Sequence, residues 1–260
     1  MGRERRRLLI PPGRLAAATA GAVALEPPER HYLRRVLRLR PGDAVEVVDG
    51  AGRLWSARLE GADGLRLEQP VGAPLQCAPP PAPRLRLALA VPRREADLAW
   101  RMATELGADD LQPLQAARCV RREALPLERW GGVVREACEQ CERLWQPRLA
   151  EPQAAAEWLA RPPRGALLLA TTRREGRPSL LELSASLAAG GAGAEGEITL
   201  AIGPEGGWTP QEEEIALAAA WQPVGLGALI LRSATAAVAG MAVLALGRDL
   251  SRPSSPSPSP

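Results

Sequence analysis

The residues best suited to chemistry stand in the stretch "ITLAIGPEGGWTPQEEEIALA", residues 198 to 218. An apolar strand that ends at Ile202 runs into Gly-Pro-Glu-Gly-Gly, and a helical pattern follows. Thr209 and Glu212 have the T-x-x-E spacing of a capped helix start. Glycine loops between a strand and a helix commonly bind phosphate through open backbone amides and a lysine. Here the loop carries a carboxylate, Glu205, so a different ligand is expected.

Several features of this loop argue against phosphate. The chain contains no lysine, and a helix start capped by its own side chains has no amides left for an anion. Three glutamates follow at 212 to 214, and no G-x-G-x-x-G fingerprint is present. A ligand beside Glu205 should be neutral or cationic where it meets the loop. S-adenosylmethionine meets this condition, because its sulfonium is positive and its adenine and ribose suit backbone contacts.

A second glycine loop follows about 20 residues later in "VGLGALILRSATAA". Gly225 and Gly227 flank a turn, an apolar run leads to Arg232, and Ser233 is a candidate N-cap for the last helix. The glycines would also suit a plain strand-to-helix link with tight packing. Two such loops so close together are better explained as two walls of one pocket.

The elements around these loops indicate an α/β domain. Strands are expected at 84–92, 165–171, 197–203 and 223–231, and helices at 95–107, 127–144 and 233–250. Such alternation predicts a mostly parallel sheet with ligand loops at the strand carboxyl ends. The expected organisation is a β-rich domain over 1–73, a Pro-rich linker over 74–84, the α/β domain over 85–248 and a disordered Ser/Pro tail over 249–260.

Composition gives weaker limits. All 33 basic residues are arginine and the net charge is +3, which permits nucleic-acid binding without requiring it. No apolar run of eighteen residues and no signal peptide are evident, so we expect a cytoplasmic protein without a membrane segment. Cys138 and Cys141 have C-x-x-C spacing, but in a helical pattern without a second ligand pair. We therefore expect buried thiols and no metal site.

A basic cluster precedes the first hairpin. His31, Arg34, Arg35, Arg38 and Arg40 lie in one short predicted helix and its exit. Two interpretations stay open at this point, a solvated helix face and a patch that contacts RNA phosphates.

The sequence blocks "IGPEGGWTPQEEEIA" and "VGLGALILRSATAA", in this order, resemble the ribosomal RNA small subunit methyltransferase E family. "HYLRRVLRLRPGD", "MATELGADDLQPL" and "RWGGVVREACEQCER" extend the resemblance to about residues 8 to 248. It implies S-adenosylmethionine-dependent formation of 3-methyluridine in 16S rRNA or the small ribosomal subunit. It also implies a homodimer, with a PUA-like β-barrel at the N-terminus and a SPOUT domain whose parallel-sheet fold contains a trefoil knot.

The same resemblance implies which residues form the cofactor site. These are Ile202, Gly203, Pro204, Glu205, Gly206, Gly207, Leu226, Gly227, Ile230, Leu231, Arg232, Thr235 and Ala236.

Uridine N3 must lose its proton before it can accept a methyl group, which defines the catalytic roles. We expect Arg232 to stabilise the developing uracil oxyanion or a neighbouring phosphate. Glu205 is expected to complement the sulfonium or, as a second choice, to accept the proton. Arg118 and Arg143 are expected to hold the RNA backbone together with His31, Arg34, Arg35 and Arg38.

Four charges typical of the family are missing here. Met102 stands for a lysine, Ala117 for a glutamate, Leu229 for an arginine and Ala234 for a glutamate. An ion-pair network lost as a whole would explain this pattern, and so would a catalytically weakened relative that still binds RNA and cofactor. An unrelated α/β enzyme with a nucleotide cofactor is a third alternative.

Overall fold

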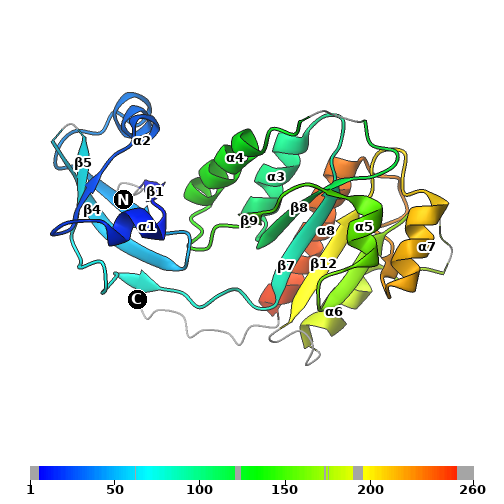
Figure 1. Ribbon diagram of the computed structural model, residues 1–260. Helices are drawn as coiled ribbons and strands as arrows, with labels where there is room; N and C mark the ends of the chain where they lie inside the picture. Colours follow the sequence, from blue (N-terminus) through cyan, green and yellow to red (C-terminus); the bar gives the residue numbers. More distant parts are fainter. Residues whose placement is uncertain are drawn as a thin grey trace. The chain divides into compact units, whose positions relative to one another are not determined.

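The computed structural model describes residues 6–61, 63–120, 124–172, 174, 176–189 and 196–250. Two compact units are present, and both are drawn in Figure 1. Unit 1 contains the chain up to Pro80 together with Arg135–Gln146. Unit 2 contains Pro81–Val134 and the chain from Pro147 onward.

Unit 1 is a six-stranded sheet with short helices. The strands run in the order β1-β3-β4-β5-β2, and β6 pairs with β4. Their bounds are β1 Arg7–Leu9, β2 Ala22–Ala24, β3 Ala44–Val48, β4 Arg53–Glu60, β5 Gly64–Leu67 and β6 Gln76–Cys77. The helices are α1 Pro12–Ala16, α2 Pro27–His31 and a π-helix, Tyr32–Val36.

The predicted hairpin turn joins β3 to β4. Asp49 accepts hydrogen bonds from the backbone N–H groups of Ala51 and Arg53, at 2.7 and 3.0 Å. Gly50 and Gly52 have φ angles of +70° and +94°, which side chains rarely adopt. The alternating pattern of β4 places Trp55, Ala57 and Leu59 in the core of the unit. The sequence therefore identified this hairpin correctly.

Unit 2 is a seven-stranded sheet in which every pairing is parallel. Its strands run in the order β10-β8-β7-β12-β11-β13, with β9 beside β8. Their bounds are β7 Arg84–Ala90, β8 Asp110–Gln115, β9 Arg148–Leu149, β10 Gln153–Ala154, β11 Ala166–Ala170, β12 Glu197–Ile202 and β13 Gln222–Val224. The helices are α3 Ala96–Glu105, α4 Leu127–Gln140, α5 Ala155–Ala160, α6 Leu180–Ala189, α7 Pro210–Ala218 and α8 Ser233–Leu250.

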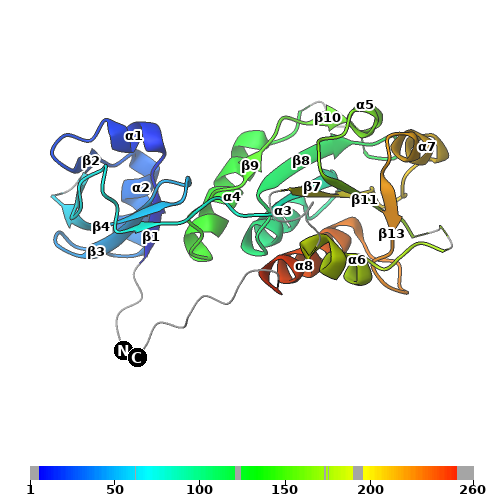
Figure 2. The same ribbon diagram turned by 90° about the horizontal axis from the view of Figure 1, so that it is seen from below.

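Helices cover both faces of this sheet (Figure 2). α3, α6 and α8 lie on one face, and α5 and α7 lie on the other. The core is divided in the same way, because Leu85, Leu87 and Leu89 of β7 face the first layer. Ala88 and Ala90 face the second layer. A central strand buried on both faces reads as a continuous apolar run, as "LALAV" at residues 87 to 91 does.

Several sequence expectations differ from the structure in detail. The strand expected over 223–231 is only the three-residue β13, because the chain turns at Gly225 and forms a loop up to α8. Gln76 and Cys77 pair with β4 inside the segment expected as a linker. Residues 135–140 of α4 belong to unit 1, and the preceding residues of this helix belong to unit 2. The predicted domain boundaries stay a proposal, and most of the predicted tail, 251–260, lies outside the described residues.

α8 is the one helix in the described part of the chain that is long and apolar enough to cross a membrane, judged by length and composition. Half of it is buried inside the protein. It packs against β7, β12, α3 and α6, and Ala237, Met241 and Leu244 are in the core. These contacts are typical of a core helix.

A carboxylate in unit 1 makes the stability of this unit depend on pH. Glu139 on α4 accepts a 2.8 Å hydrogen bond from the backbone N–H of Leu9. Burial raises the pKa of Glu139 from 4.5 to about 7, although the Leu9 amide acts in the opposite direction. The folded state therefore holds a proton that the unfolded state releases between about pH 4.5 and 7. Stability falls as the pH rises through this window.

We predict that Glu139→Gln stabilises the protein at alkaline pH, because it keeps the acceptor oxygen and removes the charge. The free energy of unfolding should rise by about 1 to 3 kcal/mol at pH 8 and stay nearly unchanged at pH 5. Denaturant titrations at both pH values measure this difference. Glu128→Gln, which removes an exposed charge from the same helix, is the control. A gain of equal size at both pH values would contradict the burial argument.

Candidate cofactor site

The capped start of α7 follows the glycine loop of residues 203 to 208 directly in the sequence. The hydroxyl of Thr209 accepts from the backbone N–H of Glu212, and Glu212 accepts from the backbone N–H of Thr209 at 2.9 Å. The predicted capping box is therefore confirmed. Because Thr209 and Glu212 satisfy each other's amides, the helix start is occupied by its own side chains, as the argument against phosphate requires.

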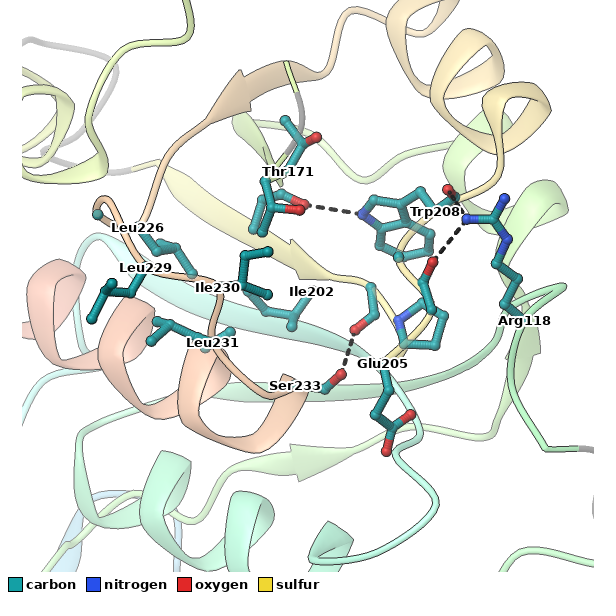
Figure 3. Close-up of a pocket in the computed structure, with 18 of the residues that line it drawn as sticks. Arg118, Thr171, Ile202, Glu205, Trp208, Leu226, Leu229, Ile230, Leu231 and Ser233 are labelled. Atoms are coloured by element: carbon teal, nitrogen blue, oxygen red, sulfur yellow. Dashed lines mark hydrogen bonds between the residues drawn. The ribbon is translucent and has the colours of Figure 1, made fainter. Parts of the chain in front are cut away.

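Glu212 also joins this helix to the loop after β8. Its carboxylate is buried, and Oε1 accepts a 2.8 Å hydrogen bond from the backbone N–H of Ala117. The next residue, Arg118, donates from Nη1 to the carbonyl oxygens of Gly206 at 2.8 Å and Trp208 at 3.1 Å. Figure 3 shows the guanidinium of Arg118 beside these carbonyls. Two adjacent residues thus fix the shape of the glycine loop.

Close packing explains two of the glycines. A Cβ at Gly203 would lie 3.1 to 3.3 Å from the indole of Trp208. A Cβ at Gly206 would lie 3.2 Å from Cδ of Arg118. Trp208 is itself held by a 3.2 Å hydrogen bond from Nε1 to the carbonyl oxygen of Ala170, at the end of β11. A side chain at either position would therefore require Trp208 or Arg118 to shift, and glycine avoids this.

The second glycine loop lies against the first. Ser233, at the start of α8, donates a 2.9 Å hydrogen bond to the carbonyl oxygen of Gly203. The sequence suggested Ser233 as an N-cap, but α8 begins at this residue and its hydroxyl reaches across to the other loop. Gly227 has a φ of +124°, so glycine suits this bend. The two loops therefore form two walls of one pocket, as predicted (Figure 3).

Most of the predicted cofactor residues line this pocket. They are Ile202, Gly203, Pro204, Glu205, Gly206, Gly207, Leu226, Gly227, Ile230, Leu231 and Ala236. Arg232 and Thr235 are exposed and are not among the lining residues, so their contact with a cofactor stays a prediction.

Glu205 lines the pocket and also makes a contact that its sequence did not predict. Its Oε1 accepts a 2.9 Å hydrogen bond from the backbone N–H of Arg93, in the loop after β7. In Figure 3 the side chain extends away from Ile230 and Leu226 on the opposite wall. This contact ties a further loop to the site. It gives Glu205 a structural function that the sequence analysis did not foresee.

The pocket has a third wall that no sequence motif predicted. Ala170, Thr171, Thr172 and Arg177 line it from the loop after β11. Their segment, "ATTRREGR", contains no glycine motif, and only the parallel pairing of β11 with β12 and β13 brings it to the site. Arg118 was expected to contact RNA, and it lines the same pocket.

The other residues expected to bind RNA are in unit 1. Arg30, His31, Arg34 and Arg35 surround a shallow hollow on α2 and the π-helix, together with Asp63. Asp63 accepts a 2.8 Å hydrogen bond from Arg30. The structure thus gathers three of the predicted residues in one basic cluster.

Two further predicted RNA contacts in this unit lie apart from the lining of the hollow. Arg38 is exposed, with a φ of +55°. Arg143 donates a 3.0 Å hydrogen bond to the carbonyl oxygen of Trp145.

Of the two cysteines expected to be buried, Cys138 has the character of a core residue and Cys141 is half-buried. Cys138 is fully buried beside Leu9, Val48 and Leu54, and burial raises its pKa to about 12. A thiol of this kind is a poor nucleophile and a poor metal ligand. Among the described residues, no three His, Cys, Asp or Glu side chains are grouped so that they could hold a metal ion.

Comparison with known proteins extends over both units. The RNA methyltransferase domain family matches residues 79–245, and the RNA methyltransferase PUA domain family matches residues 25–68. Ribosomal RNA small subunit methyltransferase E of Synechocystis sp. is 38% identical over 243 residues, with 91% of this chain and 76% of that protein covered. The Mycobacterium bovis protein of the same name is 33% identical, with 85% of each chain covered.

Solved structures have the same fold. The Neisseria gonorrhoeae ribosomal RNA small subunit methyltransferase E, bound to S-adenosyl methionine, has a TM-score of 0.74 at 28% identity. The match covers 92% of this chain and 96% of that one. A probable rRNA-methyltransferase from Porphyromonas gingivalis also has a TM-score of 0.74, at 23% identity, with 92% of this chain and 98% of that one covered, and supports the fold alone.

These matches confirm the predicted parallel-sheet α/β domain that follows an N-terminal PUA domain in the sequence. The trefoil knot stays a prediction. The chain belongs to the ribosomal RNA small subunit methyltransferase E family.

Proposed function

We propose that this protein is an S-adenosylmethionine-dependent methyltransferase that forms 3-methyluridine in 16S rRNA. The observation that carries the proposal is the pocket between the loops after β12 and β13. Its relative from Neisseria gonorrhoeae binds S-adenosyl methionine, and the relatives are named for ribosomal RNA of the small subunit. The choice of uridine N3 rests on the resemblance of the two motif blocks.

The residues of the pocket fit this cofactor better than they fit a nucleoside phosphate. Apolar side chains of Ile202, Leu226 and Leu231 and the backbone of the glycine loop form much of its lining. Such a lining suits a flat adenine and an uncharged ribose. The amides at the start of α7, which a phosphate would need, are engaged by Thr209 and Glu212.

The bound cofactor would supply a methyl group on a positively charged sulfur. The protein must hold the target uridine in line with that methyl group and favour loss of the N3 proton. Arg232 is exposed just before α8 and outside the lining of the pocket, which suits contact with the RNA more than with the cofactor. We assign it the stabilisation of negative charge on the uracil oxygen or a nearby phosphate.

Glu205 contributes by position in this proposal. Its hydrogen bond to the Arg93 amide holds the glycine loop against the loop after β7. Glu205 also lines the pocket, so it keeps its expected role of complementing the sulfonium, with acceptance of the N3 proton as the second choice.

RNA binding is assigned to the arginine clusters of the two units. Arg34, Arg35 and His31 in unit 1 and Arg118 beside the pocket offer cations to phosphate oxygens. These contacts position the RNA without reading its sequence. The target base would leave its stack to enter the pocket.

Further properties complete the proposal. A homodimer is supported by Leu229 and Ile230, whose side chains are 80% and 79% exposed beside the pocket. A cytoplasmic location agrees with a substrate in the ribosome.

A second candidate function is that of a weakened relative that binds RNA and cofactor without efficient turnover. The absence of charged side chains at Met102, Ala117, Leu229 and Ala234 favours it.

The test of the function is the nucleoside content of 16S rRNA. Cells without this gene should lack 3-methyluridine in 16S rRNA, as measured by mass spectrometry of digested nucleosides, and the purified protein should restore it. Restoration with the wild-type gene is the control. An unchanged 3-methyluridine content would exclude the assigned target, and loss of a different methylated nucleoside would redirect it.

Arg232→Ala should reduce methyl transfer by at least about a hundredfold, the size typical for removal of one donor to a developing oxyanion. Binding of S-adenosylhomocysteine should change less than twofold, because Arg232 lies outside the pocket lining. Single-turnover rates and calorimetry measure the two effects. Normal turnover in the variant would remove Arg232 from the mechanism, and equal loss of affinity would place it in the cofactor site.

Arg118→Ala should loosen the glycine loop, since it removes two hydrogen bonds from a cation to the carbonyls of Gly206 and Trp208. Amide hydrogen exchange of residues 203 to 208 should accelerate about fivefold, equivalent to about 1 kcal/mol. Arg93→Ala, which keeps the backbone amide bound by Glu205, is the matched control. Identical exchange in wild type and Arg118→Ala would show that the loop holds its shape without Arg118.

A further inference from the structure

Arg177 lines the pocket and is unused by the function proposed above. It belongs to the loop between β11 and α6, and its side chain is half-buried. The Nε atom is fully buried and has no hydrogen-bond partner among the residues that the structure describes. Nε faces Gly225 and is out of reach of a ligand. Nη2 makes no hydrogen bond within the described part of the chain and is not buried, so it can donate to an acceptor that the protein itself does not supply.

The backbone around Arg177 fixes where its side chain lies. The N–H of Gly225 donates to the carbonyl oxygen of Pro178 at 2.9 Å, and the N–H of Leu180 donates to that of Gly225 at 2.9 Å. A Cβ at Gly225 would lie 2.9 Å from Nε of Arg177 and 3.5 Å from its Cδ. The guanidinium stem therefore runs across Gly225, and Nη1 donates to the carbonyl oxygen of Arg174.

Other charged groups in the pocket lining have partners in the protein. Arg118 uses Nη1 for two loop carbonyls, and Glu205 accepts the amide of Arg93. Glu213 lies 3.5 Å from the hydroxyl of Thr171. Leu229 stands where the resemblance leads us to expect an arginine, so this wall provides no cation. Arg177 is thus a lining cation that neither holds the glycine loop nor has a role in the proposed function.

We propose that Arg177 binds the carboxylate of the amino-acid part of S-adenosylmethionine. This assignment rests on the proposed function, and it adds a residue outside both glycine motifs. The carboxylate is the one anionic group of this ligand, and a guanidinium offers it parallel N–H donors with matching geometry. The contact would place the amino-acid end of the ligand at the wall formed by the loop after β11 and Gly225.

The test is a double-mutant cycle with two ligands that differ only in this group. S-adenosylmethionine and decarboxylated S-adenosylmethionine are titrated by calorimetry into wild type and Arg177→Gln. We expect the substitution to weaken S-adenosylmethionine about tenfold, the size of one charge-assisted hydrogen bond, and to change binding of the decarboxylated ligand less than twofold. Wild type should bind the decarboxylated ligand about tenfold more weakly.

Arg174→Gln is the matched control, because it removes an equal charge from the same loop and keeps the backbone carbonyl. It should leave both affinities within twofold of wild type. Equal weakening of both ligands by Arg177→Gln would overturn the assignment in favour of a contact to ribose or adenine. No change with either ligand would also overturn it.

The comparison of the two ligands on wild type needs no variant, so the assignment stays testable if Arg177→Gln fails to fold. Equal affinity of wild type for both ligands would overturn the carboxylate contact. Wild type that binds neither ligand would overturn the proposed function itself, and this result is distinct from every outcome that concerns Arg177 alone.

Discussion

The shape of the cofactor pocket depends on the buried carboxylate of Glu212. One of its oxygens accepts the amide of Ala117 and the other accepts the amide of Thr209. A buried carboxylate is stable only when its oxygens are satisfied, so these amides must stay within reach of it. The two hydrogen bonds hold the loop after β8 against the start of α7. They also place Arg118 within hydrogen-bonding distance of the glycine loop. The carboxylate thus organises a site that it does not enter.

The parallel sheet explains why segments far apart in the sequence meet at this point. β12 lies between β7 and β11, and β13 lies on the other side of β11. In a parallel sheet all strands point the same way, so the loops after β7, β8, β11, β12 and β13 emerge at one edge. One or two hydrogen bonds then connect each loop to a neighbouring loop. Ser233 joins the two glycine loops in this way, and Glu205 joins the loop after β7.

The sequence predicted the features that follow from local chemistry. The capping box of Thr209 and Glu212, the turn at Gly50 and Gly52 and the two glycine walls are each encoded within a few residues. The third wall could not be predicted in this way, because Thr171 and Arg177 carry no motif and reach the pocket only through strand pairing. The direction of the Glu205 side chain was equally inaccessible, since its partner is the backbone of Arg93, 112 residues away.

The substituted family positions are explained by different parts of the structure. Ala117 needs no side chain for its contact with Glu212, because its backbone amide makes that bond. Ala234, in the first turn of α8, is 6% exposed and belongs to the core, where a lone glutamate would be an uncompensated buried charge. Position 229 is a leucine, so no arginine at this position balances such a glutamate. Loss of both charges is therefore far less costly than loss of one, and the glycine backbone that shapes the pocket is independent of either.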